Sequence, residues 1–175
     1  MNGPTLEELY ALFPAPGTPP AYRIIAGEEV PQPYRGLLVH EHHMTVTVEE
    51  FHGSRVDVRV LSRRSDGESY ARKILLVLQS TGRVVQFGIV RIDLAQTSPE
   101  VAAAIRSEAT PVGRILIEHD VLRRIEPTAY LRIEPGPEVR GWFGLSEPRP
   151  VYGRLALIHC DGKPAVELLE VVAPE

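Results

Sequence analysis

Alternating polar and apolar residues in the middle of the chain predict a β-sheet. The segment Arg55 to Leu61 alternates with a period of two, which is typical of a strand with one face in water. Tyr70 to Leu78 is interpreted as a second strand and Arg83 to Leu94 as a third. Ser80-Thr81-Gly82 between them favours a hairpin turn. We therefore predict three consecutive strands in this region.

Three segments carry the signals that start a helix. Thr5 and Glu8 have the spacing of a capping box, and Pro14 limits the helix that follows. The residues that would share its apolar face are Leu6, Leu9, Tyr10 and Phe13. Ser98-Pro99-Glu100 supplies an N-cap, a first-turn proline and an acid near the positive helix end. Thr110-Pro111 predicts a further short helix by the same logic.

The last part of the chain predicts more strands. Val121 to Ile133 is one, and Tyr152 to Cys160 and Pro164 to Val172 form a hairpin around Asp161-Gly162. Strands joined by short turns, with helices before and between them, indicate an α+β fold built on a single antiparallel sheet of about six strands. Residues 14–20, 31–36 and 135–150 are rich in proline and glycine and are interpreted as loops. We expect one domain over residues 1–175, with residues 1–37 as an N-terminal helix and proline-rich lead-in.

Composition narrows the function classes. The 175-residue chain is 43% hydrophobic and carries a net charge of −4, which argues against a nucleic-acid binder, because such proteins present a basic face. Cys160 is the one cysteine, so no internal disulfide can form. The start Met1 to Pro4 lacks a signal-peptide pattern, and no run approaches 18 apolar residues. We expect a cytoplasmic protein with no membrane or nucleic-acid partner.

Consecutive polar residues at His40-Glu41-His42-His43, followed by Met44, raise the question of a metal site. The zinc pattern HExxH is absent, and no other cluster completes a ligand set by its spacing. The alternative interpretation is a polar loop or helix start near a site. We favour that alternative and predict no metal and no cofactor.

Arg72 is a charged residue in an otherwise apolar strand, and alternation puts it on one face with Ile74 and Leu76. If that face is buried, Arg72 needs an anionic partner, because an unpaired buried charge is costly. A guanidinium suits a carboxylate, to which it can donate two parallel hydrogen bonds. The alternative is a surface ion pair on an edge strand, which alternation alone favours.

Two glutamates, Glu167 and Glu170, interrupt the final apolar strand. Because they lie three residues apart, a regular strand points them to opposite faces. One should be solvated, and the other should face the core or a cavity. A carboxyl group in a cavity has a raised pKa and can transfer protons near neutral pH. The pattern alone does not say which of the two this is.

Several short motifs resemble the chorismate lyase family in their order and spacing. They are Tyr70 to Leu76, Thr110 to Arg114, Tyr152-Gly153-Arg154, and Gly162-Lys163-Pro164 followed by Glu170 and Pro174, with His43-Met44-Thr45 similar to a substrate-contacting segment. The resemblance spans residue 38 to the end of the chain. It implies an antiparallel sheet of six strands with helices that flap over an internal site for an aromatic acid.

The resemblance also implies roles for individual residues. Arg72 would bind the ring carboxylate, Glu170 would be the catalytic carboxyl group, and Met44 and Val112 would contact the ligand through backbone groups. Glu170 lies four residues before Pro174, as the family's glutamate does, but one residue further from Lys163-Pro164, so a β-bulge is required. The family has an arginine directly after a glycine of the third strand. Here Ile89 follows Gly88, and Arg91 is the candidate substitute.

The function implied is a chorismate–pyruvate lyase that releases 4-hydroxybenzoate and pyruvate by cofactor-free elimination, with Glu170 and Arg72 as catalytic residues. The alternative is a non-catalytic domain of the same fold that binds a small aromatic acid, as in the effector domains of bacterial transcription regulators. About 35 residues precede the match, which we expect to be too few for a helix-turn-helix module. The expected partners are chorismate and 4-hydroxybenzoate, and the expected assembly is a monomer or homodimer.

Overall fold

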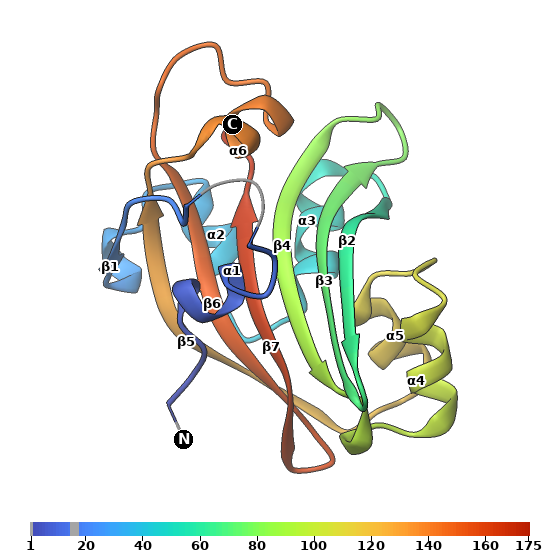
Figure 1. Cartoon of the computed structure of the whole chain (residues 1–175). Coiled ribbons are helices and arrows are strands. Elements are labelled where there is room, and N and C mark those ends of the chain that lie inside the picture. Colours follow the sequence, from blue (N-terminus) through green and yellow to red (C-terminus); the bar gives the residue numbers. More distant parts are fainter. Residues whose placement is uncertain (1, 15–17) are drawn as a thin grey trace.

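One antiparallel sheet of seven strands forms the centre of the computed structural model, which describes residues 2–14 and 18–175 (Figure 1). The strand order is β1-β5-β6-β7-β4-β3-β2, so the last hairpin lies in the middle of the sheet. The strands are β1 Tyr22–Ile25, β2 Val56–Asp66, β3 Ser69–Leu78, β4 Val84–Asp93, β5 Arg123–Ile133, β6 Val151–Cys160 and β7 Lys163–Val172. The helices are α1 Leu6–Tyr10, α2 Tyr34–Leu38, α3 Met44–His52, α4 Pro99–Arg106, α5 Val112–Glu118 and α6 Pro137–Trp142, with 3₁₀ turns at η1 Gly27–Glu29 and η2 Leu94–Gln96.

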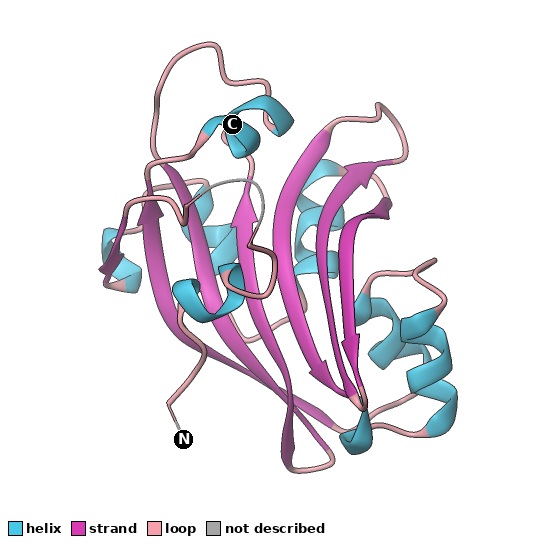
Figure 2. Ribbon diagram, viewed as in Figure 1, coloured by secondary structure: helices cyan, strands magenta, loops and turns pink. Residues whose placement is uncertain are grey.

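Helices cover both faces of the sheet (Figure 2). On the near face in Figure 1, α1 and α6 pack in a cluster that contains Phe87 and Ile89 of β4. On the far face, α2 and α3 pack against Ile74 and Leu76 of β3. Helices α4 and α5 share a third cluster with Val90 of β4. Because successive side chains of a strand point to opposite faces, β3 and β4 each contribute to the clusters on both faces of the sheet.

The predicted α+β class with a single antiparallel sheet is confirmed, and so are the local signals. Thr5 and Glu8 form the capping box of α1. The Ser98 side chain caps α4 by accepting from the Val101 N–H group. Asp161 and Gly162 have φ angles of 51° and 80°, as a type I′ hairpin turn requires.

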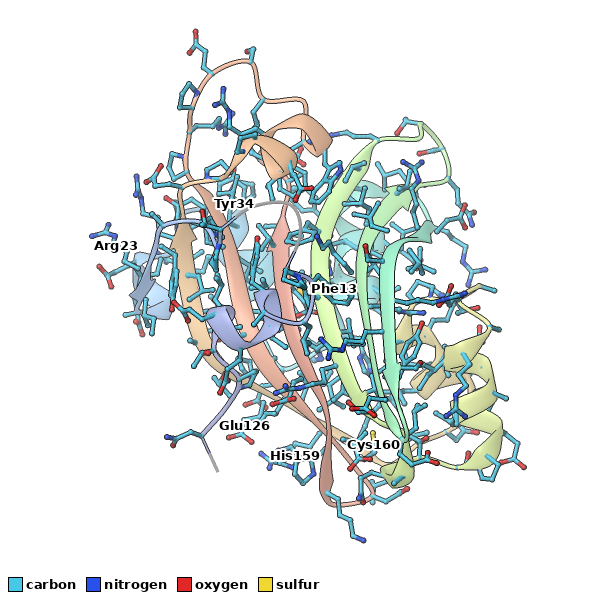
Figure 3. The ribbon with its side chains drawn as sticks, viewed as in Figure 1. Phe13, Arg23, Tyr34, Glu126, His159 and Cys160 are labelled. Carbon is cyan, nitrogen blue, oxygen red and sulfur yellow. The ribbon has the colours of Figure 1, made fainter. Side chains whose placement is uncertain are left out.

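Two details differ from the sequence-based predictions, and a third prediction is only partly covered by the structure. The sheet has a seventh strand, β1, which is short and pairs with β5 at one edge; Arg23, labelled in Figure 3, lies on this edge. Two of the predicted loops contain helices, α2 and α6, because Pro33 and Pro137 stand at their starts, where a missing N–H group is tolerated. The predicted loop at residues 14–20 lies partly outside the described residues.

The described residues include no helix long and apolar enough to cross a membrane.

Candidate ligand-binding cavity

An internal cavity lies between the far face of the sheet and the first residues of α3 and α5. Its volume is about 40 Å³, which is enough for a few water molecules. Strands β2, β3, β4, β6 and β7 contribute to its walls. The lining residues are His43, Met44, Thr45, Val58, Arg72, Ile74, Leu76, Gln86, Val90, Pro111, Val112, Gly113, Ile158, Leu168 and Glu170.

Arg72 is the charged anchor of this cavity. It is only 1% exposed, and its Nη2 donates to the Thr110 carbonyl at 3.1 Å. Its Nε and Nη1 are buried and have no hydrogen-bond partner among the described residues. Burial lowers the pKa of Arg72 from its ordinary value, while Tyr70 and Glu108 act in the opposite direction. The sequence left open whether Arg72 is buried or on the surface, and the structure buries it.

The neighbouring residue Lys73 lies on the other face of the sheet, as alternation predicts. Its ammonium group is 5.8 Å from the centre of the Phe13 ring, which is labelled on the near side of the sheet in Figure 3. A cation over an aromatic face is stabilised by the ring quadrupole. The two adjacent cations therefore have separate surroundings, and Arg72 alone reaches the cavity.

Glu170 reaches the same cavity because of a β-bulge. The pairing of β6 with β7 shifts where Ile158 and His159 face Val166 and Pro164, so Ala165 is the extra residue. This is the bulge after Pro164 that the family spacing required. Beyond it Glu170 is 7% exposed and lines the cavity. Glu167 points to the opposite face with its side chain 30% exposed.

Arg154 compensates the charge of Glu170. It is fully buried, and its Nε donates to Glu170 Oε2 at 2.7 Å. Its Nη1 donates to the carbonyls of His40 at 2.8 Å and Leu38 at 3.3 Å, and Nη2 donates to that of His42 at 3.0 Å. Arg154 thus ties residues 38–42 to the sheet directly before α3 begins. Glu170 accordingly stands in the cavity as a paired anion.

Met44 and Val112, the other two residues expected at the ligand, also line the cavity. They are the first residues of α3 and α5. The two helix starts lie in close contact. Gly113 is so near to His43 that a Cβ atom added to the glycine would lie 3.0 Å from His43 Nδ1. Four of the five predicted site residues therefore meet at one place: Arg72, Glu170, Met44 and Val112.

Arg91 is the exception. It pairs in register with Glu167 on β7, and the two side chains form an ion pair on the face away from the cavity. Arg91 lies two residues after Ile89 and so shares its face of the strand, and Ile89 packs in the near-face cluster with α1. The structure therefore does not bring Arg91 to the other predicted site residues, and it cannot contact a ligand held by Arg72.

The histidine-rich segment forms a turn and the start of α3. His40 Nε2 lies 2.6 Å from the Leu37 carbonyl, and the His42 N–H group donates to His40 Nδ1 at 3.0 Å. His43 Nε2 accepts from Arg123 Nε at 2.7 Å. Within residues 2–14 and 18–175, no group of three potential ligands has the geometry to hold a metal ion. The segment matches the polar loop and helix start favoured above.

Burial and nearby arginines keep His43 neutral. Burial, followed by Arg123 and Arg154, lowers the pKa of His43 to about 4. His43 is 7% exposed and lies in the walls of both the cavity and an open groove of about 850 Å³ that includes Arg123. Arg72 is therefore the cation of the described cavity lining at neutral pH, and it forms no ion pair with a described carboxylate, although Glu108 acts on it from a distance.

The lowered pKa of His43 predicts a loss of stability in mild acid. The unfolded chain binds this proton near pH 6.5, whereas the folded protein binds it only near pH 4. The stability from neutral His43 is therefore full above pH 6.5 and is lost as the pH falls toward 4. We expect the free energy of unfolding to fall by about 1–2 kcal/mol more in the wild type than in His43→Gln between pH 7 and pH 5. Urea unfolding at both pH values measures this; equal losses in the two proteins would contradict it.

Two residues of the site were not identified from the sequence. Arg154 appeared there only within a matched motif, and Gln86 was not singled out. Gln86 is 3% exposed, lines the cavity, and its Oε1 has no hydrogen-bond partner in the part of the chain that the structure describes. The signal for both is the same, since each is a polar residue inside an apolar strand.

Comparison with solved structures relates this architecture to known folds. A domain from Bordetella bronchiseptica, described as the ligand-binding domain of a regulator assigned to the GntR family, aligns with a TM-score of 0.51 over 67% of this chain and 85% of its own, at 13% identity. The effector domain of PhnF from Mycobacterium smegmatis gives a TM-score of 0.51 over 75% of this chain and 88% of its own, at 10% identity. The fold is that of regulator ligand-binding domains.

The match to complete PhnF indicates which part is shared. It covers 77% of this chain but only 65% of PhnF, at 8% identity and a TM-score of 0.51, whereas the effector domain alone is covered to 88%. No family model matches this chain, and no curated protein matches it. The fold shared with effector domains is thus established, and membership of the chorismate lyase family stays a prediction.

Proposed function

We propose that this chain binds a small monocarboxylic acid with an apolar, ring-sized body and does not convert it. The observation that supports this is Arg72, whose buried Nε and Nη1 face the cavity without a partner. A carboxylate would accept a charge-assisted hydrogen bond from either of these N–H groups, which lie on different edges of the guanidinium. Ile74, Leu76 and Leu168 supply the apolar walls. The shared fold with ligand-binding domains of regulators agrees with this proposal.

The charge balance of the cavity favours an acid with one carboxylate. Arg72 and Arg154 carry two positive charges, and Glu170 compensates one of them. One ligand carboxylate therefore completes the neutralisation. Chorismate has two carboxylates, and its second one would meet no further arginine or lysine in the described cavity lining, because Arg91 lies on the other face and His43 is neutral. An unpaired charge at a buried site is costly.

Ligand binding requires the cavity to open. Its volume of about 40 Å³ is far below the roughly 300–1,000 Å³ of sites that enclose small molecules. The wall formed by the sheet is held by backbone pairing of β4 with both β3 and β7, so the parts best able to move are the starts of α3 and α5. The family resemblance likewise implies helices that flap over the site, without saying which ones.

A second candidate is the chorismate–pyruvate lyase reaction, which the bulge at Ala165 favours. The bulge places Glu170 in the cavity lining. Glu170 also lies four residues before Pro174 in the sequence, as in the family. As a lyase, the chain would hold the ring carboxylate on Arg72, and Glu170 would protonate the departing ether oxygen. The hydrogen bond from Arg154 opposes this role, because it already occupies Glu170 Oε2 at 2.7 Å.

The two proposals are separated by calorimetry and a turnover assay on the full chain. We expect 4-hydroxybenzoate to bind at one site, and chorismate to bind more weakly and remain intact. Loss of chorismate absorbance with one pyruvate released per molecule consumed would replace the binding proposal with the lyase. In that case Glu170→Gln should lower kcat by about 10²–10⁴-fold, while Glu167→Gln, on the other face, should change little. Absence of binding by both acids would contradict both proposals.

A further inference from the structure

The cavity contains a second unpartnered polar group, the side-chain amide of Gln86. Gln86 Oε1 is buried, as are the two free nitrogens of Arg72. Both residues are at least 97% buried and both line the cavity. A buried polar atom without a partner is costly in the free protein. Two such groups facing one cavity indicate that its ligand completes both.

The two groups stand apart along the sheet wall of the cavity. Strand β3 pairs with β4 so that Arg72 faces Val90 and Leu76 faces Gln86. Four residues of β4 therefore separate the position beside Arg72 from Gln86, which is about 13 Å along the strand. Ile74 and Leu76 line the wall between them. The polar groups of a ligand that meets both must be separated by an apolar middle.

The chemistry of each end defines the ligand. The guanidinium of Arg72 donates only, so its partner is an anionic acceptor. The amide of Gln86 presents an acceptor oxygen and a donor nitrogen, and a hydroxyl group can pair with either one. The carboxyl group of Glu170 already receives a hydrogen bond from Arg154 at 2.7 Å. Besides Arg72, Gln86 is the described lining residue with a buried, unpartnered polar atom, so it is the candidate to bind the far end of the ligand.

We infer that Gln86 is the specificity-determining residue of this cavity and selects acids that carry a hydroxyl group at the end opposite to the carboxylate. This inference rests on the proposed function, since Arg72 must anchor the carboxylate. An acid without the hydroxyl would leave Gln86 buried and unpaired. Sites built around a buried hydrogen-bonding group reject analogues that lack the partner.

The test compares 4-hydroxybenzoate with benzoate in three proteins by calorimetry. In the wild type, 4-hydroxybenzoate should bind about tenfold more tightly than benzoate. In Gln86→Leu this ratio should fall to about one, through weaker binding of 4-hydroxybenzoate and unchanged or tighter binding of benzoate. The control is Gln79→Leu, which changes an exposed glutamine after β3 and should keep the wild-type ratio. Gln86→Leu removes an unpaired buried acceptor, so it should fold at least as stably as the wild type.

The outcomes separate this inference from the proposed function. Wild-type protein that binds neither acid contradicts the proposed function and the inference with it. Wild-type protein that binds both acids equally, or a Gln86→Leu variant that keeps the tenfold ratio, overturns the role of Gln86 and leaves Arg72 as the anchor. A fall in affinity for both acids to the same extent would assign Gln86 to packing and would also overturn the inference.

Discussion

Replacing Arg72 with methionine should make the protein more stable and remove its affinity for acids. The variant exchanges a buried guanidinium, with two nitrogens unpaired, for an apolar side chain of similar length. Exchange of buried charges for well-packed apolar groups is often stabilising by about 1–4 kcal/mol. Part of this gain is offset, because the Thr110 carbonyl loses its donor at 3.1 Å. We expect the free energy of unfolding to rise by about 1–2 kcal/mol.

Binding should change in the opposite direction. Removal of one partner from a buried, hydrogen-bonded charge pair costs about 2–5 kcal/mol, so 4-hydroxybenzoate should bind at least about 30-fold more weakly. Urea unfolding and calorimetry on the same preparations measure the two effects. The control is Arg64→Met, because Arg64 is an exposed arginine of β2 that pairs with Ala71, and it should change neither quantity. A less stable Arg72→Met variant would show that the charge of Arg72 is already compensated and would contradict its role as a free anchor.

A stability gain coupled to a loss of binding is characteristic of functional residues. Natural proteins keep groups that destabilise the fold where a ligand needs them. Arg72 and Gln86 both fit this description, as each is buried with polar atoms unpaired. Lys73 does not, since it lies beside the Phe13 ring on the other face. The contrast separates two cations that are adjacent in the sequence.

The elements predicted correctly are those that local sequence determines. Alternation identified β2, the Ser80-Thr81-Gly82 turn marked the hairpin of β3 and β4, and capping residues identified α1 and α4, because these signals act over a few residues. Strand β1 was missed because it has four residues and no alternation. It forms by pairing Ile25 with Tyr130 of β5, a partner about one hundred residues away. No local pattern encodes such an edge strand.

The site was only partly predictable for the same reason. Alternation grouped Arg72 with Ile74 and Leu76, but α3 and α5 decide that this face is buried. Regular pairing outward from the Asp161-Gly162 turn would set Arg154 opposite Leu169. The bulge at Ala165 shifts the register by one, so that Arg154 meets Glu170. The complementary charges were visible in the sequence, but their pairing depends on one irregular residue.

Replacing Arg154 with methionine should destabilise the protein more than any other single change considered above. Glu170 would remain buried without a cation, and the carbonyls of Leu38, His40 and His42 would lose their donor. Breaking a buried ion pair by removing one partner costs about 3–5 kcal/mol. A domain of this size has a total stability of about 5–15 kcal/mol, so much of it would be lost. Urea unfolding monitored by circular dichroism measures the effect.

The double variant Arg154→Met/Glu170→Met tests whether the loss comes from the stranded charge. With both charges removed, at least half of the lost stability should return, whereas unrelated sites would add their losses. The ion pair Arg91–Glu167 is the matched control, because it also joins neighbouring strands of this sheet but its side chains are 31% and 30% exposed. Arg91→Met should cost less than about 1 kcal/mol.

Arg154→Met should also loosen the start of α3. Three of its hydrogen bonds hold residues 38–42, and Met44 and Thr45 of the next turn line the cavity. Amide hydrogen exchange in residues 38–45 should therefore increase in this variant more than exchange in β2, which Arg154 does not contact. Equal increases in both segments would mean that the variant unfolds globally and that Arg154 does not specifically hold the cover of the cavity. A cost no larger than that of Arg91→Met would contradict the buried ion pair itself, because only a stranded charge makes the two variants differ.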